Sequence, residues 1–154
     1  MRVSVAVQTP LAFPALHASH AGIWLATPDG QVRTVGKGEA VGRAAETPLV
    51  MLNAPLVAQR LGYAELSGLD LLELFAFVHP ARFVVPTAKG LAGVLGIAAP
   101  AHDEAIAPFL LTATQKLLAT LTDQSWPERE GAWDAAQNLA RLRWPWANVV
   151  SRYL

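Results

Sequence analysis

The first half of the chain alternates short apolar segments with turn and helix signals. Residues 23–26 and 32–35 are apolar segments joined by the sequence Thr-Pro-Asp-Gly, which predicts a β-hairpin. The apolar run 49–52 predicts a buried strand, and residues 67–70 predict a further short strand. The pattern therefore places at least four short strands before residue 71.

Helical signals follow these strands and dominate the second half. Asn53 is a predicted N-cap, with Pro55 in the first turn of its helix and Gly62 directly after the last residue. A strongly apolar helix then ends before Pro80, and Thr87 caps the next one. The predicted helices span residues 38–45, 55–61, 71–78, 88–95, 103–121 and 131–143.

Early strands followed by many helices predict an α/β fold. We expect one domain over residues 1–154, with a small mixed sheet flanked by helices and a helical C-terminal third. A chain of this length can bury a sizeable core without disulfides or a structural metal. Residues 1–13 are expected to be irregular.

Composition narrows the class of protein. Hydrophobic residues make up 53% of the chain and charged residues only 16%, against roughly 25% charged in soluble domains. This low content of charged residues favours an apolar surface that contacts a partner.

The longest apolar runs fall short of the ~20 residues of a membrane span. Gln8, Pro10 and Pro14 interrupt any signal-peptide core. We therefore expect a cytoplasmic protein that neither spans nor binds a membrane.

Charge and cysteine content exclude further classes. The chain has no cysteine, which excludes disulfides, thiolate nucleophiles and cysteine-based zinc sites. Twelve basic and twelve acidic residues give a net charge of zero, so any DNA contact must be local. Residues 36–39 contain glycines but lack the spacing of a P-loop. No cofactor is expected in this chain.

Three segments together resemble a known family. They are LVMLNAPLV at 49–57, SGLDLLELF at 67–75 and KGLAGVLG at 89–96. Their order resembles the proofreading-exonuclease superfamily (DnaQ-like, DEDD exonuclease-like), which implies a ribonuclease-H-like fold. In that family a buried strand ends in an Asn-Ala-Pro motif, an aspartate opens the next helix, and a Leu-Ala-x-x-Leu-Gly helix follows. Residues 52–96 resemble most closely the N-terminal region of bacterial DinG-like ATP-dependent DNA helicases.

The resemblance implies four carboxylates that hold two divalent cations, and this chain departs from that pattern. The first motif, Asp-x-Glu on the opening strand, would fall at residues 16–20, which contain no acid. The second aspartate would lie four residues after Asn53, where the chain has Val57. Two-metal hydrolysis depends on this carboxylate set. We therefore expect no catalytic residue and no bound metal.

The remaining motif positions lead to the same expectation. The last motif would place an aspartate four or five residues after His102, where the chain has Ile106 and Ala107. Asp70 matches a family position that does not bind metal, and we interpret it as a helix N-cap or a surface partner of Glu73. Asn53, Val57 and Asp70 are thus read as a vestigial motif.

A cationic and aromatic cluster lies near the C-terminus. Arg141, Arg143, Trp144 and Trp146 combine charges with aromatic faces, as contacts to single-stranded nucleic acid do. The alternative is that these tryptophans, with Trp126 and Trp133, close the core or form an interdomain interface.

The leading hypothesis is a non-catalytic, exonuclease-like accessory domain of a DinG-like DNA helicase in DNA repair or replication. The expected partners are the helicase motor domains of the same polypeptide, beyond residue 154, and single-stranded DNA. ATP and Mg²⁺ would be the cofactors of that motor.

One alternative is an active metal-dependent 3'-5' exonuclease with an unusual ligand set. Its ligands would be Asp70, Glu73, Asp103 and Glu104. Another is a free-standing interaction module.

Overall fold

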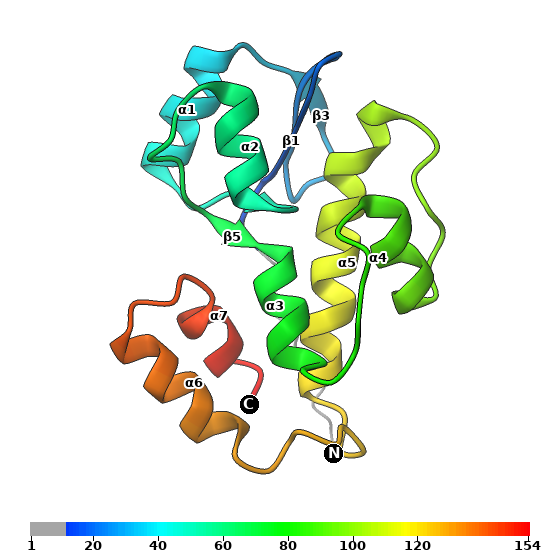
Figure 1. Ribbon diagram of the computed structural model, residues 1–154, viewed down its shortest axis with the longest axis vertical. Helices are drawn as coiled ribbons and strands as arrows, with labels where there is room; N and C mark the ends of the chain where they lie inside the picture. The colour runs from blue at the N-terminus through cyan, green and yellow to red at the C-terminus, as the bar shows by residue number, and fades with distance from the viewer. Residues whose placement is uncertain (1–11) are drawn as a thin grey trace.

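A mixed sheet with helices on both faces organises the molecule (Figure 1). The computed structural model describes residues 12–154. Residues 1–11 of the predicted irregular segment 1–13 lie outside the described residues. So do Gln8 and Pro10, two of the residues expected to interrupt a signal-peptide core. The elements are β1 (Ala15–Ser19), β2 (Gly22–Ala26), β3 (Val32–Thr34), α1 (Lys37–Glu46), β4 (Val50–Met51), α2 (Ala54–Leu61), β5 (Leu69–Asp70), α3 (Leu71–Val78), α4 (Ala88–Leu95), the 3-10 turn η1 (Asp103–Ala105), α5 (Ile106–Leu121), α6 (Ala132–Arg141) and α7 (Ala147–Ser151).

The five strands lie in the order β3-β2-β1-β4-β5. β2 is antiparallel to both β1 and β3, whereas β4 is parallel to β1 and to β5. The predicted β2-β3 hairpin is confirmed, and its turn closes where the Thr27 N–H donates to the Gln31 carbonyl at 2.8 Å. Gly30 in this turn has a φ of 96°, which favours glycine. The expected small mixed sheet is therefore present.

β1, the central strand, is the strand that the hydrophobic pattern did not predict. It pairs along its whole length with β2 but meets β4 only where Ala15 lies opposite Val50. Its residues are buried or half-buried on both faces, so the simple alternation of a half-exposed strand is missing. Because β4 is so short, one edge of β1 continues past it toward Ser19.

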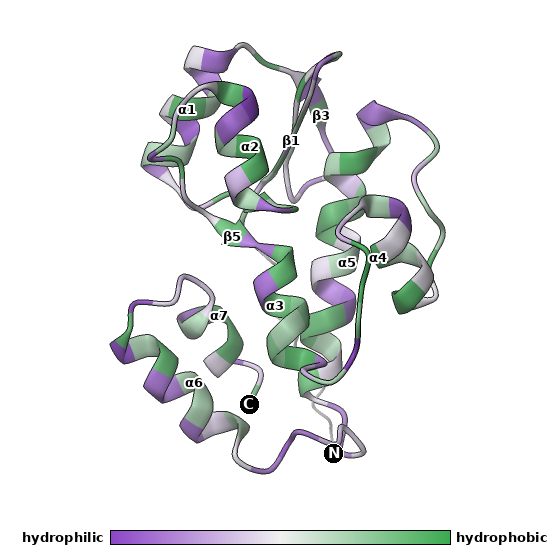
Figure 2. Ribbon diagram, in the orientation of Figure 1, coloured by the Kyte–Doolittle hydropathy of each residue, from purple (hydrophilic) through white to green (hydrophobic). Residues whose placement is uncertain are grey.

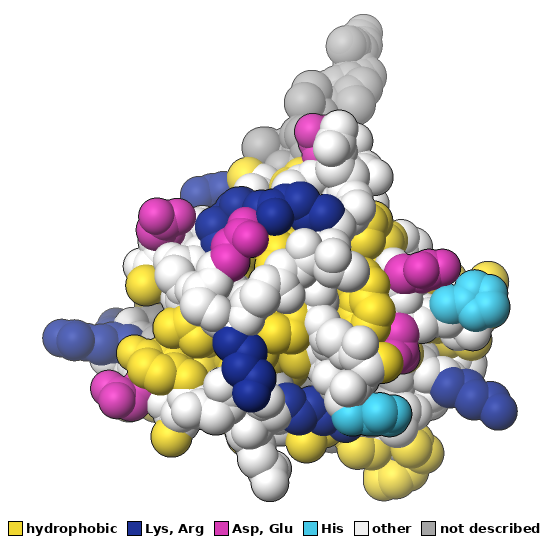
Figure 3. Space-filling view, turned by 90° about the horizontal axis from the view of Figure 1, so that it is seen from above, with side chains coloured by type: hydrophobic (Ala, Val, Ile, Leu, Met, Phe, Trp, Pro, Cys, Tyr) yellow, Lys and Arg dark blue, Asp and Glu magenta, His cyan; other side chains and the backbone are white. Residues whose placement is uncertain are grey.

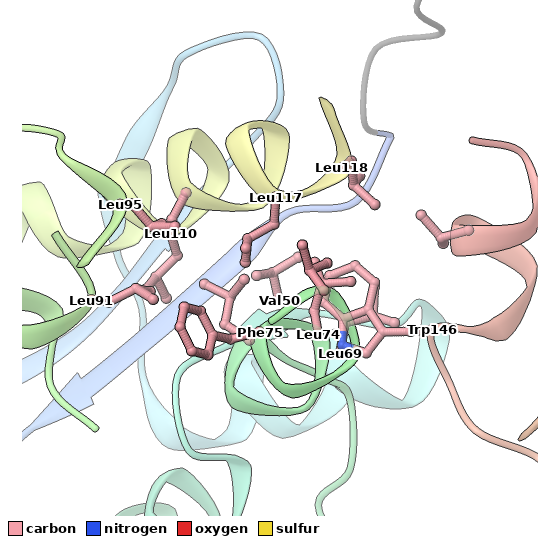
Figure 4. Close-up of a cluster of buried hydrophobic side chains, with 14 of the residues drawn as sticks. Val50, Leu69, Leu74, Phe75, Leu91, Leu95, Leu110, Leu117, Leu118 and Trp146 are labelled. Atoms are coloured by element: carbon pink, nitrogen blue, oxygen red, sulfur yellow. The ribbon is translucent and has the colours of Figure 1, made fainter. Parts of the chain in front are cut away.

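The sheet separates two hydrophobic cores because successive strand residues point to opposite faces. One core, which includes Leu16, Leu25 and Met51, lies under α1 and α2. The larger core lies on the other face and joins the strands to α3, α4 and α5. Figure 4 shows leucines of α5 above Val50, Leu69 and Phe75, and Figure 2 shows how strongly hydrophobic α3 is.

Most helix boundaries agree with the predictions, with two exceptions. The predicted helix 103–121 begins instead as the 3-10 turn η1 and becomes α-helical only at Ile106. The short helix α7 was not predicted, because five residues are too few to show a helical period. The caps are as predicted: the Asn53 side chain accepts from the Leu56 N–H, and that of Asp70 from the Leu72 N–H.

Three tryptophans attach the C-terminal third to α3. The Trp146 Nε1–H donates to the Asp70 carbonyl and the Trp126 Nε1–H to the Val78 carbonyl, both at 2.8 Å. The Trp144 Nε1–H donates to Glu73 Oε1 at 2.9 Å. These contacts reach the beginning, first turn and end of α3, so the helices α6 and α7 form a layer beside it (Figure 1).

Candidate functional site

A cavity of about 210 Å³ opens beside β1, beyond the point where β4 ends. We call it the His17 cavity. It lies between β1, α2, the N-terminus of α4 and the start of α5. Its lining residues are Leu16, His17, Ala18, Leu52, Leu56, Val57, Arg60, Pro86, Thr87, Ala88 and Ile106.

This cavity gathers the positions that the resemblance singled out. Residues 16–18 belong to the segment where the first family motif would fall, Val57 is the second position, and Ile106 is one of the two last positions. They come from three elements far apart in sequence. The fold therefore brings the three motif segments together, although none of these side chains is an acid.

His17 supplies the main polar atom of the cavity. Its ring stacks on that of Trp24, with centroids 5.8 Å apart. Its Nε2 is buried and has no hydrogen-bond partner, since Asp103 Oδ1 lies 3.7 Å away, beyond hydrogen-bond range. Burial lowers the pKa of His17, the Asp103 carboxylate opposes this shift, and the Arg60 charge reinforces it.

Arg60 brings a positive charge to the same cavity. Its Nη1 donates to the Ala18 carbonyl at 2.7 Å, which occupies one of the five guanidinium N–H groups. This bond lies on the part of β1 that continues past β4, so the arginine takes the place of a strand partner there. Sequence reasoning missed Arg60, because only the packing of α2 against β1 reveals its partner.

Asp103 lies next to His17 but is already bonded. Its Oδ2 accepts a hydrogen bond from the Ser19 hydroxyl at 2.9 Å. Ser19, His17 and Asp103 thus share a region, but the serine bonds to the aspartate and not to the histidine. This is not the nucleophile-base order of a catalytic triad. The cavity lining itself contains no carboxylate.

Asp70 has a structural environment. Its side chain is 5% exposed and accepts three backbone hydrogen bonds, from Asn53 at 3.0 Å, Ala54 at 2.8 Å and Leu72 at 3.0 Å. The carboxylate therefore joins the end of β4 to the starts of α2 and α3. We call this arrangement, with the Trp146 bond to the Asp70 carbonyl, the Asp70 junction. The predicted N-cap role of Asp70 is confirmed.

The acids of the alternative nuclease site are separately engaged. Asp70 is held by backbone N–H groups, Glu73 by Trp144, and Asp103 by Ser19. Glu104 is exposed on the turn η1. Among residues 12–154, no three His, Asp or Glu side chains are grouped so that they could hold one metal ion.

The C-terminal cluster is divided between core and surface. Trp146 is fully buried, so its ring cannot stack on a base in this fold, which corrects its place among the candidate DNA contacts. Trp144 is half-buried against Phe77, with ring centroids 5.3 Å apart. Arg141 and Arg143 are exposed, and Arg143 has a φ of 63° where the chain leaves α6. Of the four residues of this cluster, Arg141 and Arg143 are therefore the exposed ones.

Comparison with known protein families, with curated proteins and with solved structures finds no match. Within residues 12–154, no helix combines the length and the apolar composition needed to cross a membrane.

Proposed function

We propose that this chain is a non-catalytic, exonuclease-like accessory domain, with a ribonuclease-H-like fold, of a bacterial DinG-like DNA helicase. The observation that carries the proposal is the His17 cavity, which brings together residues 16–18, Val57 and Ile106, three places where the family's carboxylate motifs would fall. The order of strand, Asn53 cap, Asp70-opened helix and α4 also follows the order of the family's segments. The domain would act in DNA repair or replication as part of that helicase.

The chemistry of the cavity supports a binding role without hydrolysis. Two divalent cations need several carboxylate oxygens. The side chains of Val57 and Ile106 are hydrocarbons and cannot bind a metal ion, and the positive charge of Arg60 would repel a cation. In contrast, the guanidinium group of Arg60, which is exposed and uses one N–H group for the Ala18 carbonyl, suits a ligand with anionic oxygens.

We therefore propose single-stranded DNA as the ligand, held through a phosphate by Arg60 at the mouth of the cavity. The contact would be local, because the chain is neutral overall. Figure 3, a view onto the end of the molecule formed by α1 and α2, shows basic, acidic and hydrophobic side chains interspersed. A short contact of this kind predicts weak, salt-sensitive binding.

Packing against the helicase motor is the second candidate role. It is favoured by large hydrophobic side chains that lie on the surface. Phe83 is 82% exposed, Leu142 is 78% exposed and Trp133 is 53% exposed. Aromatic residues are enriched in protein interfaces, so these side chains are the candidates for contact with the motor domains.

One titration tests these roles together. A fluorescent single-stranded oligonucleotide is titrated with the protein at low and moderate salt, with and without Mg²⁺ or Mn²⁺, while anisotropy and product length are recorded. We expect salt-sensitive binding and no shortening. Arg60→Ala should weaken binding at least fivefold, whereas Arg129→Ala, at an exposed arginine outside the cavity, should leave it within twofold. Circular dichroism checks that both variants fold.

Each other outcome has a definite meaning. Binding that survives Arg60→Ala but is lost in the double variant Arg141→Ala, Arg143→Ala would move the DNA contact to the end of α6. No binding by the wild-type protein would favour the packing role alone. Metal-dependent shortening that Glu104→Gln abolishes, in a variant that circular dichroism shows to be folded, would establish the exonuclease alternative.

A further inference from the structure

A larger hollow lies on the other side of α2. The cavity uses Leu56, Val57 and Arg60, whereas this hollow is lined by Ala54, Pro55, Ala58, Gln59 and Gly62. At 3.6 residues per turn these two sets lie on opposite faces of the helix. A ligand in the hollow would therefore not touch the His17 cavity.

The hollow continues into a second one. The first has a volume of about 590 Å³ and the second of about 230 Å³. They share Ser67, Gly68 and Pro145, so they form one continuous surface, which we call the Pro145 groove. It runs from α2 and the start of α3 across the loop before β5 to the end of α1. The further lining residues are Tyr63, Ala64, Leu66, Asp70, Glu73, Ala44, Ala45, Glu46, Thr47 and Pro48.

The charged side chains that line the groove are all acidic. The lining includes the acids Glu73 and Glu46 but no lysine, arginine or histidine. The carboxylate of Asp70, which also borders the groove, is fully engaged by backbone N–H groups. One oxygen of Glu73 accepts from Trp144, which fixes the side chain and leaves its second oxygen for a ligand. Glu46 is exposed at the other part of the groove.

The rest of the lining is mostly apolar and small. Three prolines and several alanines form much of the lining, and Tyr63, which is 41% exposed, adds an aromatic side chain. Nucleic acid is disfavoured, because its phosphates would meet carboxylates without a compensating cation. A peptide with apolar side chains and a positive charge matches both properties of the groove.

We propose that the Pro145 groove binds a basic peptide segment of a protein partner. Apolar side chains of the peptide rest on Pro55, Tyr63 and Pro145, and its Lys or Arg side chains pair with Glu73 and Glu46. Proline and aromatic surfaces of this kind accept extended segments. This interaction is separate from the DNA contact proposed at the His17 cavity and does not depend on it.

The test begins with selection from a random dodecapeptide library against the wild-type protein. The enriched peptides are made with a fluorescent label, and their binding is measured by anisotropy. We expect peptides with net positive charge. The double variant Glu46→Gln, Glu73→Gln should weaken them at least tenfold, because glutamine at 73 keeps an acceptor for Trp144 and removes only the charge.

The matched control is the double variant Glu128→Gln, Glu130→Gln, which removes two charges at exposed positions outside the groove. It should leave peptide binding within twofold. Failure to enrich peptides, enrichment of acidic peptides, or equal loss in both double variants would overturn the proposal. So would displacement of the peptide by a single-stranded oligonucleotide. The DNA titration described above is independent of every one of these results.

Discussion

The Asp70 junction contains an aspartate, and Asp103 lies beside His17 next to the His17 cavity, yet the polar groups of the two regions are satisfied to different degrees. At the junction, three backbone N–H groups converge on one buried carboxylate. At the cavity, Asp103 is bonded to Ser19 only, and the neighbouring His17 Nε2 has no partner. A buried polar group without a partner costs free energy.

This difference separates structural from functional chemistry in the molecule. The junction uses every acceptor to hold the chain, so it has nothing left to offer a ligand. At the cavity, the His17 Nε2 is buried without a partner, and the exposed Arg60 keeps most of its guanidinium N–H groups available for a ligand. Substitutions at the junction should therefore affect folding, and substitutions at the cavity should affect binding and pH dependence.

The largest effect is expected from Asp70→Ala. It removes the acceptor of three buried N–H groups, and we expect a loss of about 3 to 5 kcal/mol in the free energy of unfolding, measured in urea. Asp70→Asn keeps one carbonyl acceptor and should lose about half as much. A loss below about 1 kcal/mol for the alanine variant would show that the junction does not hold the fold.

Trp146→Phe tests the other half of the junction. The substitution removes the N–H that bonds the Asp70 carbonyl and leaves space in the core. We expect it to lower the free energy of unfolding by about 2 to 3 kcal/mol. Trp133→Phe, at a tryptophan that is 53% exposed, serves as the control and should change stability by less than about 0.5 kcal/mol. Equal effects would contradict the assignment of Trp146 to the core.

Two glycines of α4, the helix whose N-terminus borders the cavity, form a matched pair. A Cβ at Gly90 would lie 2.4 Å from the Val85 carbonyl oxygen, whereas one at Gly93 would meet no atom within 4 Å. We expect Gly90→Ala to destabilise the protein by about 1 to 3 kcal/mol. Gly93→Ala should stabilise it by up to about 1 kcal/mol. Thermal unfolding of the pair measures both signs, and the same sign in both would refute the close approach at Gly90.

The smallest effect concerns pH at the cavity. Burial lowers the pKa of His17, so the unfolded chain binds its proton more readily than the folded chain. Stability is therefore fully present above the unfolded pKa of about 6.5 and is lost as the pH falls toward the lower folded pKa. Urea unfolding of the wild type at pH 7.5 and 5.5 should show this loss, by at most about 1.4 kcal/mol per pH unit for one histidine.

His17→Gln should reduce that pH dependence. Burial also lowers the pKa of His79, with a smaller contribution from Arg82, so part of the slope should remain in this variant. His79→Gln is the complementary control and should remove that remaining part. An unchanged slope in His17→Gln would indicate that the buried imidazole of His17 is not the group that titrates.

Local signals in the sequence were sufficient for most of the elements. The Thr-Pro-Asp-Gly turn, the Asn53 and Asp70 caps and the apolar period of α3 each depend on neighbouring residues. The strand β1 was missed because it is buried on both faces, and α7 because it is too short to show a period. Val57 was singled out only through the resemblance, as the position of the family's second aspartate, and its place at a cavity was not predicted.

The sequence by itself determined the α/β class, the hairpin, the capped helices and the lack of cysteine chemistry, because each of these follows from composition or from residues a few positions apart. Only the tertiary structure decided that Trp146 belongs to the core, that Arg60 meets the Ala18 carbonyl, and that His17 lies beside Asp103. Those contacts join residues that lie between 42 and 86 positions apart in the chain. Pairings over such separations depend on how the helices pack on the sheet, which no local pattern encodes.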